Sequence, residues 1–176
     1  MAEIHVFGQI VGAGKFNTNG LFCKWNIVFG GGWNLIEGNV CGQTQVDYSA
    51  FEDQAFWCHP IDVHFATIGI QNWPKIIFEV WRQDFYGKST LCSYSFCHIP
   101  SEPGFHEIKC FTWKPAGSRE DQIASLFTGA GLRLSNSSTI SENFERFRLQ
   151  TESSGELNLE LFIIFKNFEK FGIEIE

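Results

Sequence analysis

Residues 57–87 read WCHPIDVHFATIGIQNWPKIIFEVWRQDFYG, and they contain two β-strand patterns separated by a break. Apolar and polar residues alternate over 61–66, which is the two-residue period of a strand with one buried face. Gly69 and the Trp73-Pro74 pair interrupt this pattern, because proline cannot donate to a β-ladder. The second pattern, 76–81, is apolar on one face and half apolar on the other. Strands of this kind fit the interior of a sheet, so we expect the two to be adjacent strands, joined by a turn and paired at its centre.

The same two-residue period recurs along the rest of the chain. Turn residues such as glycine, asparagine and proline separate the segments, and no βαβ rhythm is present. We interpret residues 50–60 as a loop that folds back onto the core. In the first strand we expect a bulge at Gly8. Roughly nine strands of this kind predict an antiparallel β-sandwich. The further strand candidates are residues 3–12, 21–29, 33–36, 43–48, 90–99, 105–113, 146–151 and 157–165.

The period changes once, at residues 118–128, where one short amphipathic helix is expected. Ser118 followed by Asp121 resembles a capping box, and apolar residues follow at helical spacing. The 176 residues contain no linker or repeat, so they predict a single all-β domain, 1–176. Its tail, 166–176, is expected to dock either on the domain or on a partner.

Charge and cysteine usage exclude several classes of protein. The net charge of −7 provides no basic field for nucleic acid, and the longest wholly apolar run, 161–165, is far too short to cross a bilayer. The six cysteines form no C-x-x-C motif, and no secretory signal is visible. We therefore expect a reducing, cytoplasmic compartment and thiols that are mostly buried in strands.

No arrangement of residues predicts catalysis or a resident metal. No G-x-S-x-G motif occurs, and each cysteine lies in a strand context that does not lower a thiol pKa. A zinc site would need a fourth ligand at suitable spacing, and a calcium site between loops would need clustered carboxylates such as D-x-D. We expect hydrogen-bonded imidazoles and solvated or turn-capping carboxylates instead. The residues weighed are Cys58, His59 and His64; Cys92, Cys97 and His98; and Asp47, Asp62 and Asp84.

The aromatic residues allow two interpretations of equal weight. Six tryptophans are many for one core to hide, so they could be core residues with exposed edges or a docking surface for another protein. The candidates for partner contact are Trp33, Phe51, Trp57, Phe168 and Phe171.

The chain also resembles a known family, the B9 domain family, and the likeness covers nearly its whole length. The combination of HPID, HFAT, WP and FCHIP is specific. The matching segments are WCHPIDVHFATIGIQNWPKIIFEVWRQDFYGKS (57–89), LFCKW (21–25), GQTQVD (42–47), FCHIP (96–100), PGFH (103–106), TWKPAG (112–117) and KNFEKFG (166–172).

This resemblance implies a C2-like antiparallel sandwich and a non-enzymatic scaffold subunit of the ciliary transition zone or basal body, with no cofactor. Its expected partners are a paralogous B9 domain protein and the Meckel syndrome type 1 protein. Together they would belong to a tectonic-like complex at the ciliary membrane that supports ciliogenesis and the ciliary diffusion barrier, with indirect membrane association. The alternatives are a C2-like module that binds lipid or calcium directly, and a cysteine-based enzyme.

Overall fold

The computed structural model describes residues 1–49, 54–117, 133–134, 140 and 149–171. Within these ranges the chain forms nine strands and one 3-10 turn, which confirms the all-β prediction. The helix expected at 118–128 and the first half of the strand expected at 146–151 lie outside the described residues. The elements are β1 (Ala2–Gly14), β2 (Leu21–Val28), β3 (Trp33–Gly38), β4 (Cys41–Gln43), β5 (Gln54–Thr67), β6 (Lys75–Gln83), β7 (Ser89–His98), β8 (Gly104–Pro115), β9 (Thr151–Lys166) and η1 (Glu169–Phe171).

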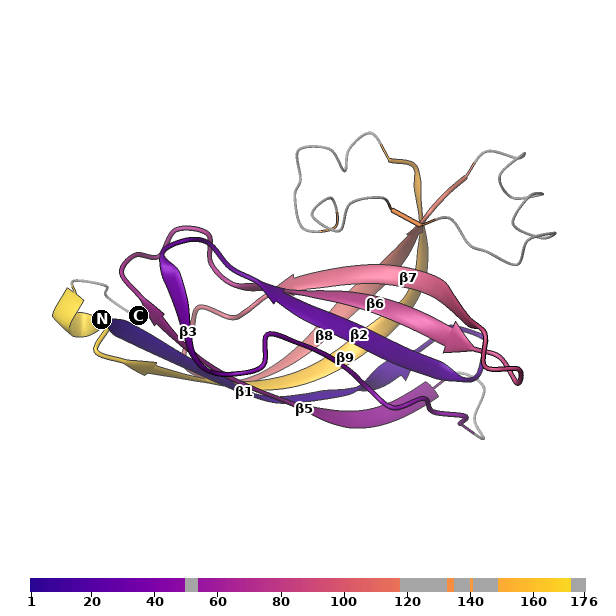
Figure 1. The fold of residues 1–176 in the computed structure, drawn as a ribbon, viewed down its shortest axis with the longest axis horizontal. Coiled ribbons are helices and arrows are strands. Elements are labelled where there is room, and N and C mark those ends of the chain that lie inside the picture. The colour runs from indigo at the N-terminus through magenta and orange to yellow at the C-terminus, as the bar shows by residue number, and fades with distance from the viewer. Residues whose placement is uncertain (50–53, 118–132, 135–139, 141–148, 172–176) are drawn as a thin grey trace.

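The strands form one antiparallel sheet in the order β3-β5-β1-β9-β8-β7-β6-β2-β4. This sheet curls back on itself, so that β2, β6 and β7 lie opposite β1, β5 and β9 (Figure 1). The two layers join between β7 and β8 through a single register pair, Tyr94 with Trp113. The predicted antiparallel sandwich is therefore confirmed, and its two layers belong to one continuous curled sheet.

The expectation that the strands of 57–87 pair with each other at the centre is wrong. β5 pairs with β1 and β3, whereas β6 pairs with β7 and β2, so the two strands lie in different layers. The link over 68–74 contains Trp73-Pro74 and is longer than the two to five residues typical of a hairpin. Alternation identifies the buried face of each strand, but it does not identify the strand's neighbour.

The core fills the space between the layers and follows the predicted alternation. In β9 the four inward residues are at most 2 % exposed, while the residues between them point outward. Burying one such aliphatic side chain stabilises the fold by about 1.5–3 kcal/mol, so β9 is a major part of the core. These four residues are Leu157, Leu159, Leu161 and Ile163.

The bulge expected at Gly8 lies elsewhere. The register of β1 shifts between Ile10 and Gly12 against both of its neighbours, while Gly8 stays paired on both sides. Gly8 has a different physical role, because a Cβ atom there would collide with the carbonyl oxygen of Glu160. Glycine at this position allows β1 and β9 to approach closely.

The boundaries of β5 and β4 also differ from expectation. β5 begins at Gln54, inside the expected 50–60 loop, and its first residues pair with the end of β1. The register between β1 and β5 shifts beside Cys58, which has φ +45°, and β5 continues through Pro60, where its pairing with β3 has not yet begun. β4 ends at Gln43 rather than continuing to residue 48, and the rest of that segment contributes one bridge, between Asp47 and Leu21.

The six cysteines all carry free thiols. The prediction of mostly buried thiols is correct for the strand interiors and wrong at two positions, because Cys41 lies on the edge strand β4 and Cys58 lies at the bulge. Desolvation raises the pKa of Cys23 far above that of an ordinary thiol, so this residue stays protonated and unreactive. Cys23 and Cys110 are buried, Cys92 and Cys97 are half-buried, and Cys41 and Cys58 are exposed.

Candidate interaction surface

Three of the five aromatic residues proposed as partner contacts lie in the domain's own core. Trp33 is 2 % exposed, and Trp57 and Phe168 are each 3 % exposed. The indole N–H groups of both tryptophans donate to backbone carbonyl oxygens at 3.1 Å, and the Phe168 ring lies 4.6 Å from that of Phe165. Side chains this deeply buried contribute little to an outer surface, so their evident role is to stabilise the domain. Phe51 and the side chain of Phe171 lie outside the described part of the chain, and their contact with a partner stays a prediction.

A different set of aromatic rings lies on the outside of the sheet, across β1, β9 and β8. Phe7 is directly opposite Phe162, which is in turn opposite Phe105. The first pair stacks with ring centroids 5.4 Å apart at 9°, and the second pair lies 4.7 Å apart. Phe162 and Phe105 remain 42 % and 48 % exposed. We call Phe7, Phe162 and Phe105 the aromatic row.

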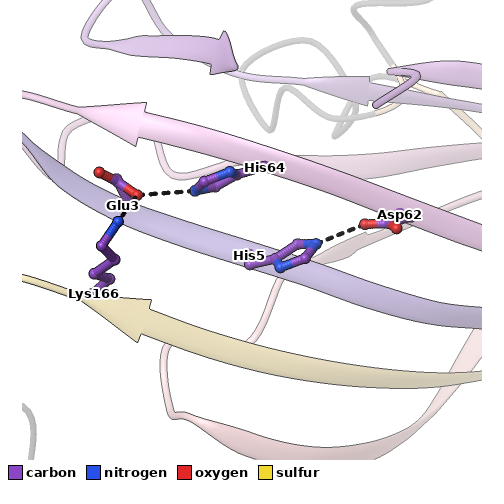
Figure 2. Close-up of polar contacts among 5 residues, drawn as sticks. All are labelled: Glu3, His5, Asp62, His64 and Lys166. Atoms are coloured by element: carbon purple, nitrogen blue, oxygen red, sulfur yellow. Dashed lines mark hydrogen bonds and ion pairs between the residues drawn. The ribbon is translucent and has the colours of Figure 1, made fainter. Parts of the chain in front are cut away.

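A polar cluster borders the aromatic row on β1, β5 and the end of β9 (Figure 2). The Nε2 atom of His5 lies 2.7 Å from Asp62 Oδ1. Glu3 Oε2 is 3.2 Å from His64 Nε2 and accepts a hydrogen bond from Lys166 Nζ at 3.0 Å. The two imidazole rings are 5.3 Å apart. Each imidazole thus has its own carboxylate, and the cluster joins the three strands across their outer face.

The hydrogen bond from Lys166 lowers the pKa of Glu3, and the charge of Lys166 and the nearby His64 act in the same direction. Desolvation of the carboxylate opposes them without reversing the shift. The pKa of Glu3 is lower in the folded state than in the unfolded state, so the ionised carboxylate stabilises the fold. This stabilisation is fully present at pH values above the unfolded-state pKa. It is lost as the pH falls through the folded pKa.

An acidic pair borders the aromatic row on its other side. Glu107 of β8 is directly opposite Glu160 of β9, and both point outward. Glu160 Oε2 accepts a hydrogen bond from Gln9 Nε2 at 2.7 Å. Among the described residues, neither carboxylate of this pair has a salt bridge. A shallow hollow of about 380 Å³ lies beside them, over β8 and β9.

A second hollow, of about 570 Å³, lies near the edge strands β3 and β4 and contains several reactive types of side chain. Its lining includes Cys41 and the imidazoles of His5, His59 and His64. Two of these imidazoles are already paired with carboxylates, and burial lowers the pKa of His59. In the described ranges there is no hydrogen bond between Cys41 and an imidazole, and no group of three potential ligands is close enough to hold a metal ion.

The isolated carboxylates cap turns and strand ends. Asp84 Oδ1 accepts bonds from the backbone N–H groups of Tyr86 and Lys88, both at 2.9 Å, in the β6–β7 turn. Asp47 Oδ2 accepts from the N–H of Phe56 at 2.8 Å. The contacts of Asp84 agree with the turn-capping role expected from the sequence, whereas Asp47 bonds to the beginning of β5.

The aromatic row was not found from the sequence, although part of its signal is present there. Phe162 lies between two inward residues of β9, and Phe7 follows inward Val6 in β1, so alternation places both outside. Their alignment with Phe105 depends on the register of strands that are more than fifty residues apart in sequence. Single-sequence periodicity carries no information on that register.

Comparison with known proteins gives matches that cover almost the entire chain. Residues 4–164 match the model of the B9-C2 family, described as "Ciliary basal body-associated, B9 protein". B9 domain-containing protein 2 of Xenopus laevis is 50 % identical over 174 residues, and that of Homo sapiens is 48 % identical, each alignment covering 99 % of both chains. B9 domain-containing protein 1 of Xenopus laevis is 24 % identical over 96 % of this chain and 87 % of its own length.

Among solved structures, the chain is similar to the C2A domain of plant Extended Synaptotagmin 1, with a TM-score of 0.46 and 12 % identity over 92 % of this chain and 93 % of that one. The family match and the full-length relatives agree with the motifs noted in the sequence. This chain therefore belongs to the family of ciliary basal body-associated B9 proteins.

Proposed function

We propose that this protein is a non-enzymatic scaffold subunit of the ciliary transition zone that binds sister B9-domain proteins. In this proposal its partners are a paralogous B9 protein and the Meckel syndrome type 1 protein, within a tectonic-like complex on the cytoplasmic side of the ciliary membrane. The assembly would support ciliogenesis and the ciliary diffusion barrier. Family membership supports the ciliary role, and the aromatic row is the observation that favours protein binding.

The aromatic row suits an interface for two physical reasons. Aromatic side chains dominate the energetics of protein–protein contacts, where they are desolvated at the centre of the interface. Here they stand on three paired strands, so their positions are fixed before binding and little conformational entropy is lost. Ion pairs and charges surround them, as expected for the polar rim of a binding surface.

The test is co-expression of this chain with the two proposed partners, followed by measurement of the complex mass by light scattering. A complex of defined stoichiometry is the expected result, and crosslinking mass spectrometry should place crosslinks on β1, β8 and β9. Failure of all three proteins to form a stable complex at micromolar concentration would refute the scaffold proposal.

One observation favours a second candidate function, direct membrane contact. Phe85 and Tyr86 project from the tip of the β6–β7 turn and are 95 % and 92 % exposed. Aromatic residues of this kind anchor proteins at the lipid–water interface, and Lys88 next to them could meet an anionic headgroup. Sedimentation with phosphatidylserine-containing liposomes, lost in Phe85→Ala/Tyr86→Ala, would support this function, and equal recovery in the supernatant would refute it.

A further inference from the structure

The acidic pair of Glu107 and Glu160 is unfavourable in the isolated domain. Carboxylates directly opposite each other on adjacent antiparallel strands repel. The neighbouring Lys109 lines the same hollow, but its salt bridge is with Glu156, at 3.6 Å, and among the described residues it forms none with Glu107 or Glu160. The amide of Gln9 donates to Glu160, which orients that carboxylate without neutralising it. Two negative charges therefore stand side by side at the border of an exposed aromatic surface.

The arrangement resembles one half of a binding site for a basic side chain. Glu107 and Glu160 line the hollow of about 380 Å³ over β8 and β9. Along the same two strands, their outward neighbours are Phe105 and Phe162 of the aromatic row on one side and Lys109 and Asn158 on the other. A lysine or arginine bound between the carboxylates would remove their repulsion, and an apolar residue beside it would cover the rings.

Charge also decides between the possible occupants of this surface. Anionic lipid headgroups and nucleic acid would be repelled by the acidic pair and by the net charge of −7. A second copy of this chain, docked about a two-fold axis that passes beside Glu107 and Glu160, would bring the two acidic pairs together, so such a dimer is disfavoured. A different protein that presents a basic side chain next to apolar ones matches both the charge and the surface.

We propose that the outer face of β1, β9 and β8 binds a partner protein through a lysine or arginine seated between Glu107 and Glu160, with apolar partner residues on the aromatic row. This assignment rests on the proposed scaffold function and identifies the surface and the chemistry by which a partner is recognised.

The test measures the affinity of purified variants for the co-purified paralogous B9 protein and, separately, for the Meckel syndrome type 1 protein. We expect Glu107→Lys/Glu160→Lys and Phe162→Ala each to weaken binding to one of these partners at least tenfold. The controls are Glu37→Lys, which reverses one carboxylate on β3, and Tyr48→Ala, which removes an exposed ring outside the strands. Both controls should bind as the unaltered chain does.

A milder variant separates binding from folding. Glu107→Gln removes one of the two like charges, so it should raise the thermal midpoint of the isolated domain while weakening partner binding. A raised midpoint with unchanged affinity would show that the acidic pair has no role in recognition, and it would overturn the proposal.

The other possible results distinguish a failure of this surface from a failure of the scaffold function. Binding by the unaltered chain together with full binding by the charge-reversal variant refutes this surface and leaves the scaffold function intact. No binding of either partner by the unaltered chain refutes the scaffold function, and this proposal falls with it. Concentration-dependent dimerisation that Phe162→Ala abolishes would assign the face to a second copy and would also refute the proposal.

Discussion

Replacing Gly8 by alanine should destabilise the domain strongly, because the new methyl group has no space between β1 and β9. The added Cβ atom would collide with the Glu160 carbonyl oxygen and lie 2.9 Å from the Cα atom of Leu161. Carbon atoms pack at about 3.5 Å or more, so the contact with Leu161 alone requires the two strands to separate by about 0.6 Å, and the collision with the carbonyl oxygen requires more. Both strands are paired on their other sides, to β5 and β8, which resists that movement.

Overpacking of this kind typically costs about 1–3 kcal/mol, and the collision here is with backbone atoms, so we expect about 3 kcal/mol. Since 1 kcal/mol shifts the thermal midpoint of a domain of this size by about 2–4 °C, the midpoint should fall by about 6–12 °C. Urea unfolding followed by circular dichroism gives the free energy directly.

Gly31→Ala is the matched control, because no atom lies within 4 Å of the Cβ position at Gly31. It should be neutral or slightly stabilising, since alanine restricts the unfolded chain more than glycine does. If Gly8→Ala unfolded within about 0.5 kcal/mol of the control, the close packing of β1 against β9 would be wrong.

Three further predictions concern other parts of the fold. Lowering the pH from 7 to 3 should reduce the urea midpoint more in the unaltered chain than in Glu3→Gln, because the depressed pKa of Glu3 stabilises the fold only while the carboxylate is ionised. Native-state alkylation read by mass spectrometry should modify Cys41 and Cys58 before the buried thiols; a uniform rate would contradict their burial. Tyr94→Phe should lower the free energy of unfolding by about 1 kcal/mol, because the hydroxyl accepts a bond from the Leu134 N–H; an unchanged urea midpoint would argue against that contact.

The sequence predicted the faces of the strands well and their neighbours poorly. Alternation in β9 identified four residues that are nearly inaccessible to solvent, because burial selects side chains locally and with a period of two. The pairing of β5 with β1 and β3 depends on contacts between distant segments, which leave no periodic trace in either strand. Short loops would have constrained the pairing, but the 68–74 link is long enough to cross between layers.

The candidate surface was also only partly predictable. Counting tryptophans suggested that some were exposed, yet Trp33 and Trp57 are buried with their N–H groups bonded to carbonyl oxygens. Burial of an indole depends on which strands pack around the ring, and the sequence does not reveal this. The exposed row instead consists of Phe7, Phe162 and Phe105, none of which was among the candidates for partner contact.

The position of β9 has a consequence for synthesis of the protein. The last strand to leave the ribosome pairs with the first, β1, and both lie in the interior of the sheet rather than at its margins. Until β9 has been translated, β1 and β8 each lack a neighbour, and unpaired strands of this kind are prone to aggregation. A premature stop codon anywhere before β9 would therefore leave a chain whose sheet cannot close, and such a fragment should be recognised by chaperones and degraded rather than persist with partial activity.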